Sequence, residues 1–565
     1  MDECMNNKEY IAYLNSLHSY NAKNSNAYGE KNVKNDFFEK VLVEVGLCSY
    51  IKKQLEEKAP QVIILTGHAG DGKTSIMYKV LKDFGIEFDN ENEIQDIKLP
   101  NGKECRCIKD FSELNDEKKK KYLKESLDFP NKGNYAFIVS NTGPLINTFT
   151  SLFDENDQAE MKMIDAIDDN SGEIKDIKGY KLNVINVASI DNTNFAVKFV
   201  ENMIKDELWE KCKDCSKCSH CYIFRNRNLI VYNQERVLEF IRKHYIWLAE
   251  HGTRLTIRSM TEQLAYMITG GVECEDVREK NENLMLFFNL FFGYLGLRNN
   301  KKADTILAIK ESKKCGYDRK RLRVDEKLMI NCDYKGLFND EMNAILIKSE
   351  NSDRLLKGWI EFIRRAYIFT NIVTDKQRKR EDNEDIFSKQ FERYLTLRDN
   401  ENEKLLYADN KLIIDALSMM YLGKVAGNRD SSIPITLNKA SGLTQNVQLV
   451  TGAIYTRDIK LEKEQSKDGK FDENSKRYKL YLNVNKNRLD YVISLPMLDY
   501  FEELKNGVIS TNIDPQLSHG VESLKAQLAR VCKDDDDIIE IVVLKNKNDS
   551  YYKFEITNDN DVRIV

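Results

Sequence analysis

Short apolar runs alternate with amphipathic stretches between residues 61 and 191. An apolar run of about four to eight residues is typical of a strand buried on both faces, and apolar positions three and four apart are typical of a helix that packs on such a sheet. We therefore predict a parallel sheet covered by helices on both faces. The predicted strands are Val62–Leu65, Cys105–Ile108, Tyr135–Val139 and Leu182–Val187.

The pattern differs on either side of this region. The first 35 residues are polar and are expected to form a loosely packed lead-in, whereas Phe37–Glu57, Gln234–Ile268 and much of residues 280–425 have helical periodicity. A charged run from Glu462 to Arg477 is expected to be a mobile loop. Apolar runs with strand character predict a C-terminal α+β domain. These runs are Val447–Ile454, Tyr478–Val484, Tyr491–Leu495, Ile538–Leu544 and Tyr551–Ile556.

A glycine-rich segment separates the first predicted strand from the helix that follows it. Residues 67–74 fit the pattern G-x-x-x-x-G-K-[ST], in the strand–loop–helix context that a phosphate-binding P-loop requires. Its glycines let backbone N–H groups turn toward phosphate oxygens, Lys73 can reach the β- and γ-phosphates of ATP, and the Thr74 hydroxyl can ligate Mg²⁺. A glycine-rich turn that binds nothing would not account for the Gly-Lys-Thr order. The residues expected to bind the nucleotide are Gly67, His68, Ala69, Gly70, Asp71, Gly72, Lys73, Thr74 and Ser75.

A P-loop site also needs a carboxylate near the Mg²⁺ and a group that positions water. Asp110 and Glu113 follow the strand that ends at Ile108, so Asp110 could hold Mg²⁺ and Glu113 could polarise the attacking water. A helix cap formed by Asp110 or Ser112 is an equally good interpretation. Asp191 is a weaker rival for the Mg²⁺ carboxylate.

Two further residues are candidates for contacts with the γ-phosphate. Asn141 follows the strand Tyr135–Val139, and in AAA-type ATPases an Asn at such a strand end, the sensor residue, lies beside the γ-phosphate. The alternative is an N-cap for the helix that starts near Pro144. Arg254 and Arg258 precede an apolar helix that resembles a small lid; either could reach the nucleotide, with Arg258 as the main candidate, or lie on the surface.

Four cysteines are spaced C-x2-C-x2-C-x2-C within ten residues. They are Cys212, Cys215, Cys218 and Cys221. Four thiolates suit tetrahedral Zn²⁺, whereas the ferredoxin spacing differs from this one, so zinc is the expected metal and an iron–sulfur cluster the alternative. His220 is a substitute ligand, and a reduced cysteine-rich loop without metal is the remaining interpretation. No catalytic His/Glu pair accompanies the cluster, which predicts a structural role.

Composition narrows the class of protein. The 565 residues are 41% hydrophobic and carry a net charge of −5, which argues against a uniformly basic nucleic-acid binder. The acidic N-terminus lacks an apolar core, and the apolar stretch Leu284–Leu297 is too short to span a bilayer, so we expect a cytoplasmic protein with no membrane partner. Three basic runs could contact nucleic-acid phosphates, but acidic residues follow each, which favours solvated helix faces. These runs are Lys118–Lys121, Arg319–Arg323 and Lys376–Arg380.

These observations predict an α/β chain built on an AAA-like P-loop NTPase with a parallel sheet. A Cys4 metal loop, a helical lid and middle region, and a C-terminal α+β domain complete it. The predicted parts are a polar lead-in and helix (1–60), the ATPase core (61–200), the metal loop and lid (201–275), a helical domain (276–430) and the C-terminal domain (431–565).

The chain resembles the P-loop ATPase component of DNA phosphorothioation-dependent restriction systems, of the DptF type. The resemblance covers roughly residues 37–275 and rests on four segments. They are Gly67–Thr74, Lys109–Leu114, Val139–Leu145 leading to Phe149, and the cysteine cluster followed by Asn226 and Leu229. The resemblance implies an ATPase that acts with partner subunits to restrict DNA lacking a sulfur backbone modification.

The expected function is therefore that of an ATP-hydrolysing subunit in a DNA-restriction complex. Any DNA contact would be made through the complex, and a partner subunit would cut the DNA. A homo-oligomer of the chain is a further possibility. The first alternative is a stand-alone AAA-like nucleotide-switch signalling or regulatory ATPase that never touches DNA. The second is a phosphotransferase that uses the same P-loop on a small molecule.

Overall fold

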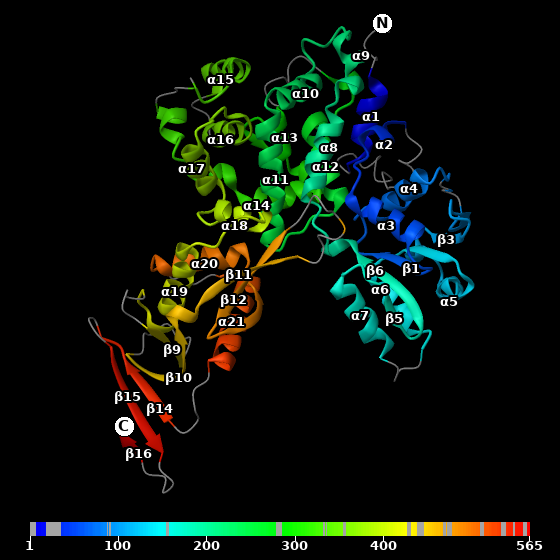
Figure 1. Ribbon diagram of the computed structural model, residues 1–565. Coiled ribbons are helices and arrows are strands. Elements are labelled where there is room, and N and C mark those ends of the chain that lie inside the picture. The colour runs from blue at the N-terminus through cyan, green and yellow to red at the C-terminus, as the bar shows by residue number, and fades with distance from the viewer. Residues whose placement is uncertain are drawn as a thin grey trace. The chain divides into compact units, whose positions relative to one another are not determined.

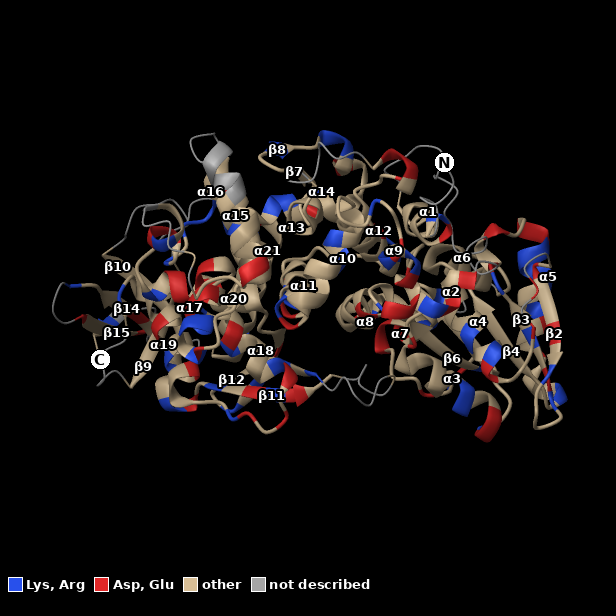
Figure 2. Ribbon diagram, turned by 90° about the horizontal axis from the view of Figure 1, so that it is seen from above, with Lys and Arg blue, Asp and Glu red and all other residues tan. Residues whose placement is uncertain are grey.

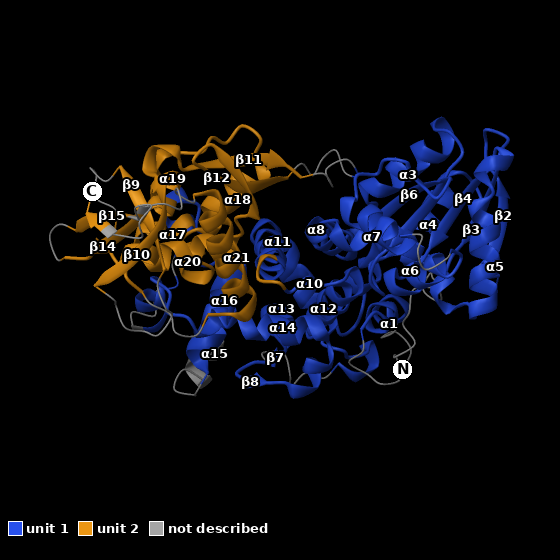
Figure 3. Ribbon diagram, turned by 90° about the horizontal axis from the view of Figure 1, so that it is seen from below, with its two compact units in different colours: residues 1–249, 253–379, 467–474 blue, residues 250–252, 380–466, 475–565 orange. Residues whose placement is uncertain are grey.

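The computed structural model shows two compact units (Figures 1 and 3). Unit 1 comprises residues 1–249, 253–379 and 467–474, and unit 2 comprises residues 250–252, 380–466 and 475–565. The finer five-part division of the chain stays a prediction. The structure describes residues 7–18, 36–87, 89, 92–153, 158–277, 285–330, 334, 336–353, 358–425, 431–437, 446–466, 471, 477–508, 513–532, 538–545, 549–556 and 562–564.

A six-stranded sheet organises the first part of unit 1. Its order is β2-β3-β4-β1-β6-β5, and the four central strands run parallel. These central strands match the four predicted ones. The edge strands β2 and β5 pair antiparallel, so the sheet is mixed and the expectation of a wholly parallel sheet was wrong at its edges. The strands are β1 (Val62–Thr66), β2 (Ile94–Lys98), β3 (Glu104–Ile108), β4 (Tyr135–Val139), β5 (Lys175–Ile177) and β6 (Tyr180–Asn186).

Helices cover both faces of this sheet (Figure 1). Alternate residues of β1 point to opposite faces, so Ile63 and Leu65 pack with α3 and α4 while Val62 and Ile64 pack with α5, α6 and α7. All five residues of β1 are buried, which places the loop after Thr66 on a rigid support. The helices are α3 (Gly46–Glu57), α4 (Lys73–Asp83), α5 (Asp116–Leu127), α6 (Thr142–Thr150) and α7 (Ala159–Asp169).

The rest of unit 1 is mainly helical. Its N-terminal helix α1 buries Tyr10 and Leu14, so this part of the expected loose lead-in is wrong. The predicted helices Phe37–Glu57 and Gln234–Ile268 are each broken into two. In the described part of the chain, no helix is both long and apolar enough to cross a membrane. The further elements are α1 (Lys8–Ser16), α2 (Asp36–Val41), α8 (Thr193–Met203), α9 (Glu210–Lys213), α10 (Tyr222–Tyr232), α11 (Gln234–Glu250), α12 (Ile257–Thr269), α13 (Phe287–Phe291), β7 (Tyr294–Leu295), β8 (Arg298–Asn299), α14 (Leu307–Cys315), α15 (Asp340–Asp353), α16 (Trp359–Thr370) and the first residues of α17 (Lys376–Ile386), most of which belongs to unit 2.

A buried histidine joins three helices of this region. The fully buried His244 of α11 contacts the Tyr317 hydroxyl through Nδ1 at 3.1 Å and the Ser312 hydroxyl of α14 through Nε2 at 2.8 Å. Ser312 also donates to the Ala308 carbonyl and accepts from Gln263 of α12. The Ser312 hydroxyl proton is therefore already donated to that carbonyl, so the hydrogen bond between Ser312 and His244 must be donated by the imidazole. This assigns the imidazole proton to Nε2. Burial lowers the pKa of His244 to about 3.

Unit 2 combines helices with two antiparallel sheets. One sheet has the order β16-β15-β14-β10-β9 and the other β11-β12-β13. The run Tyr491–Leu495 was predicted as a strand. Tyr491 and Val492 do end β13, but Leu495 and Pro496 open α20, because proline suits the first helical turn. The elements are α18 (Phe391–Asp399), α19 (Tyr407–Leu422), β9 (Ser432–Leu437), β10 (Val447–Tyr455), β11 (Lys460–Gln465), β12 (Tyr478–Val484), β13 (Asn487–Val492), α20 (Leu495–Lys505), α21 (Pro515–Val531), β14 (Ile538–Val543), β15 (Ser550–Ile556) and β16 (Val562–Ile564).

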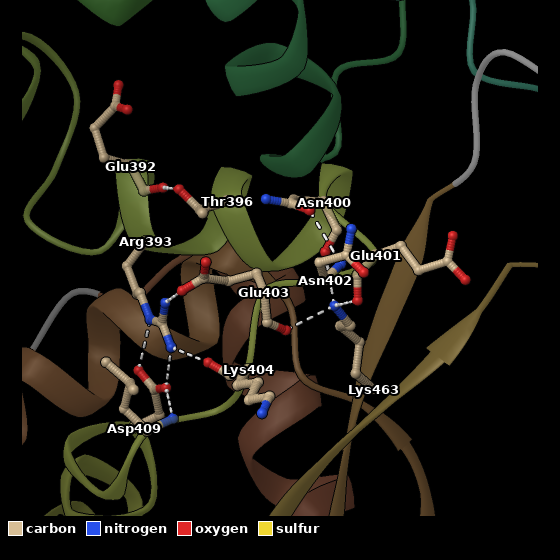
Figure 4. A network of polar contacts seen from close by, with 11 residues as sticks. Glu392, Arg393, Thr396, Asn400, Glu401, Asn402, Glu403, Lys404, Asp409 and Lys463 are labelled. Carbon is tan, nitrogen blue, oxygen red and sulfur yellow. Dashed lines mark hydrogen bonds and ion pairs between the residues drawn. The ribbon is translucent and has the colours of Figure 1, made fainter.

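A polar network fixes the loop between α18 and α19 (Figure 4). The Lys463 ammonium of β11 donates to the carbonyls of Asn400, Glu401 and Glu403 at 2.7–3.0 Å. Arg393 of α18 pairs with Asp409 and with Glu403. The charged run from Glu462 was expected to be a mobile loop. Its first residues instead form β11, because their backbone pairs antiparallel with β12, and residues 467–470 and 472–476 lie outside the described residues.

Candidate functional site

The loop after β1 has a backbone that only glycine adopts readily. Gly67, Gly70 and Gly72 have φ values of 145°, 89° and 79°, in the region that disfavours side chains. A Cβ on Gly70 would lie 3.1 Å from Cβ of Arg258, and one on Gly72 would lie 3.2 Å from Ile257. The glycines are therefore required by the turn and by the approach of α12. Gly72 directly precedes the first residue of α4, Lys73.

The Lys73 side chain is held by three oxygen atoms. Its ammonium donates to the carbonyls of Gly67 and His68 at 3.3 and 2.7 Å and to Oδ1 of Asn141 at 3.0 Å. Burial lowers the pKa of Lys73, and the negative charges of Asp71 and Asp110 oppose that shift. The ammonium thus lies at the junction of β1, β4 and α4 with its position fixed before any ligand arrives.

Asn141 occupies the N-cap position of α6, but its side chain makes no capping hydrogen bond. The amide oxygen instead accepts from Lys73. The Asn141 backbone N–H donates to the Ser112 hydroxyl at 2.6 Å, which ties the end of β4 to the turn after β3. Of the two interpretations of this residue, the contact with Lys73 favours a role in the site over capping.

Asp110 and Glu113 lie in the same cavity wall as Lys73, Thr74 and Asn141. Asp110 precedes a short turn of helix, Phe111–Glu113, without capping it through its side chain. Asp191, in contrast, accepts from both the backbone N–H and the hydroxyl of Thr193 at 2.7 Å, as an N-terminal cap of α8 does. These contacts favour Asp110 over Asp191 as the carboxylate of the site.

The start of α12 closes on the glycine loop. The Arg258 backbone N–H donates to the Gly70 carbonyl at 3.0 Å, and the Arg258 residue lines the cavity. Arg254 pairs with the fully buried Asp71 at 2.9 Å, and Asp71 also accepts from the His68 N–H at 2.9 Å. Asp71 therefore braces the loop and does not face the cavity. This bracing role was missed from the sequence, where Asp71 appeared only as a member of the motif.

The cavity has a volume of about 440 Å³ and two kinds of wall. The polar wall comprises Lys73, Thr74, Ser75 and the groups described above. The apolar wall was missed from the sequence, because its members come from α1, α2, α3 and α8. It includes Phe38, Val41, Val45, Phe195 and Phe199, and the rings of Phe195 and Phe199 are stacked with centroids 5.5 Å apart.

The cysteine cluster lines a second, smaller cavity, of about 30 Å³. Cys212, Cys215, Cys218 and Cys221 are joined there by a fifth free thiol, Cys274, which the sequence analysis did not include because it lies far along the chain. The exposed His220 does not line this cavity. No three His, Cys, Asp or Glu side chains in the described part of the chain have the arrangement of a formed metal site.

Comparison of the chain with protein-family models, with curated proteins and with solved structures found no match.

Proposed function

We propose that the chain is an ATPase of the P-loop type, with the larger cavity as its ATP site. One observation carries the proposal. The Lys73 ammonium, the Asn141 amide and the carboxylates of Asp110 and Glu113 come from three separate segments and converge on one cavity behind a glycine loop. Its volume of about 440 Å³ lies in the range of small-ligand sites.

Each of these groups has a part in binding or hydrolysis. The glycine loop and the N-terminus of α4 would bind phosphate oxygens through backbone N–H groups, and Lys73 would neutralise charge on the β- and γ-phosphates. Glu113 would accept a proton from the attacking water, and Asn141 would orient the γ-phosphate. Arg258, beside the loop, is the candidate for a second positive charge at that phosphate.

The residues present fit a Mg²⁺ ion. The Thr74 hydroxyl and the Asp110 carboxylate supply the oxygen donors that Mg²⁺ prefers, and both line the cavity wall. Mg²⁺ would neutralise charge on the phosphates when bound. The apolar wall around Phe195 and Phe199 offers the surface that a purine base requires.

ATP hydrolysis by the purified full chain tests this proposal. Lys73→Ala should lower turnover by at least about a hundredfold, because it removes the positive charge that faces the phosphates. Lys82→Ala is the matched control, since Lys82 lies on the same helix with a half-exposed side chain and pairs with Glu39. Equal ATP hydrolysis by Lys73→Ala and the parent chain, with both folded, would refute the assignment.

The biological setting rests on the sequence resemblance. We propose a cytoplasmic subunit of a DNA-restriction complex that acts with partner subunits on DNA lacking phosphorothioate modification. The alternative is a stand-alone nucleotide-switch ATPase. ATP turnover should be measured with no DNA, with unmodified DNA and with phosphorothioated DNA, each with and without the candidate partner subunits. A higher rate of ATP hydrolysis with unmodified DNA supports a role in restriction. A rate that changes with neither DNA nor partner subunits supports the alternative.

A further inference from the structure

We propose that the smaller cavity is a zinc site whose ligands are Cys212, Cys215, Cys221 and Cys274, with Cys274 in place of Cys218. The first three come from the turn around the end of α9 and the start of α10. Cys274 comes from the short helical turn Cys274–Asp276 that follows α12. The site goes beyond the ATPase proposal and does not depend on it.

Geometry brings these thiols together. All five cysteines border the same cavity of about 30 Å³, which has room for a single ion or a small amount of water. Cys274 lies close enough to interact electrostatically with Cys221, Cys212 and Cys215, and Cys212 does so with Cys221 and Cys215. Cys274 therefore interacts with each of these three cysteines of the turn, and all four border one cavity. Zinc binding would have to draw the four sulfur atoms into ligand distance.

The surroundings suit a thiolate site. The nearly buried Asn7 donates its side-chain N–H to the Cys212 sulfur at 3.3 Å and to the Leu208 carbonyl at 2.8 Å. Such N–H donors orient a metal-binding side chain and stabilise its thiolate without binding the metal themselves. Lys217 also lines the cavity and can offset the net negative charge of a zinc ion bound by four thiolates. A cavity of this size favours one tetrahedral ion over an iron–sulfur cluster, which is larger.

The inferred ligand set determines which structural elements the metal would connect. Cys274 follows α12 by only a few residues, and the start of α12 contacts the glycine loop. A metal held by four cysteines of the α9–α10 turn would fold that turn on itself. A metal held by Cys274 as well would join the turn to the end of α12, because the two segments share one ion.

Zinc analysis of the purified full chain and of three single variants tests the ligand set. Cys274→Ser and Cys215→Ser should each lower zinc affinity by at least about tenfold. Cys218→Ser, the matched control within the same turn, should keep about one zinc per chain. Cys274→His should retain zinc, because imidazole is also a zinc ligand. Loss of zinc in Cys218→Ser with retention in Cys274→Ser would overturn the proposal.

Alkylation of the unaltered chain gives a test that does not depend on a variant folding. Zinc-loaded protein is treated with a thiol reagent, digested and examined by mass spectrometry, with and without prior chelation. Protection of Cys212, Cys215, Cys221 and Cys274, with Cys218 modified, is the expected result, and chelation should expose all five. Equal labelling of Cys274 with and without zinc would overturn the proposal, as would a brown iron–sulfur chromophore in the purified protein.

Discussion

The contact of Asn141 with Lys73 indicates a role in the candidate site that its position in the sequence alone does not. An Asn at the first turn of a helix is usually a cap, yet the Asn141 amide oxygen accepts from Lys73 and not from the backbone of α6. The two functions differ in their consequences. Loss of a cap lowers stability, whereas loss of a contact with Lys73, the proposed phosphate-binding lysine, should lower turnover.

Replacement of Asn141 separates these consequences. Asn141→Ala should slow ATP hydrolysis by at least about tenfold, and its stability cost of about 1–2 kcal/mol should come from the lost hydrogen bond to the buried Lys73 ammonium, because no capping bond is lost. Asn115→Ala is the control: its side chain does cap α5, accepting from the Lys118 N–H, so it should cost about 1 kcal/mol and leave turnover unchanged. Thermal melts and ATPase rates measure both effects. A destabilised Asn141→Ala with normal turnover would contradict the assignment.

His244 makes stability depend on pH. Its pKa falls from the ordinary value of 6.5 to about 3, so the folded chain holds it neutral where the unfolded chain protonates it. The resulting stability is present above pH 6.5 and is lost as pH falls toward 3, with a slope of up to about 1.4 kcal/mol per pH unit. His18, with a pKa lowered to about 4, acts in the same direction.

Melting temperatures from pH 8 to pH 5 test this dependence. His244→Gln should lower the melting temperature at pH 8, because the contacts with Tyr317 and Ser312 are altered, but should flatten its decline toward pH 5. His519→Gln, at an exposed position of α21, is the control and should keep the parent slope. An unchanged slope in His244→Gln would contradict the inferred neutral histidine.

At the scale of elements, the glycine loop and α12 form one connected assembly. Asp71 is fully buried, and its carboxylate is compensated by Arg254 and by the His68 N–H. Arg254 also donates to the Val187 carbonyl at 3.1 Å, so one guanidinium joins the segment before α12 to the glycine loop and to the residue that follows β6. Removal of one partner would leave a buried charge with fewer partners, which costs more than the pair itself contributes.

A double-mutant cycle measures this coupling. Arg254→Ala should lower the free energy of unfolding by about 2–4 kcal/mol and weaken ATP binding. Adding Asp71→Asn to the same chain should restore at least about 1 kcal/mol of this free energy, because the unpaired buried charge is then removed. Arg457→Ala, which removes an exposed partner of Asp458, should change stability by less than about 0.5 kcal/mol. Additive effects of Arg254→Ala and Asp71→Asn would show that the two side chains do not interact.

The elements that could be predicted from the sequence are those with a largely apolar, buried pattern. The strands β1 and β4 are continuous apolar runs, β6 has a buried central stretch that includes Asn183, and β3 alternates buried cysteines with polar residues, so periodicity identified them. The edge strands β2 and β5 are partly exposed and polar, and β11 reads Lys-Leu-Glu-Lys-Glu-Gln, so nothing in their local pattern distinguishes them from loops. Edge strands are recognised only when a neighbouring strand pairs with them.

The residues of the candidate sites likewise divide into those that the sequence could identify and those that it could not. The glycine loop, Lys73 and the four clustered cysteines share a local pattern and could be found from spacing alone. Cys274, the pairing of Arg254 with Asp71 and the ring pair Phe195–Phe199 arise through tertiary structure, because the chain between these residues and the motif folds back. Local sequence carries no signal for such contacts.

At the scale of the whole molecule, charge is distributed evenly. Figure 2 shows lysine and arginine interleaved with aspartate and glutamate along both units. Some residues of the basic runs considered for DNA contact form ion pairs: Lys118 with Glu93, Lys119 with Asp116 and Arg380 with Glu384. Lys320, in another run, lies over the rings of Trp247 and Tyr317. A surface of this kind favours weak, salt-sensitive DNA affinity over tight binding.

The last prediction follows from this distribution and concerns DNA cleavage. The resemblance to the ATPase component of a restriction system implies that a partner subunit cuts the DNA, and nucleases that use two metal ions need clustered carboxylate oxygens. The purified chain should therefore hydrolyse ATP slowly and leave unmodified DNA intact, while cleavage should require the partner subunits. Gel analysis of plasmid DNA with ATP and Mg²⁺ measures this, with Lys73→Ala in the reconstituted complex as the control that should abolish cleavage. Efficient ATP-dependent cleavage by the chain alone would overturn its assignment as a non-nuclease subunit, because the cutting activity would then reside within these 565 residues.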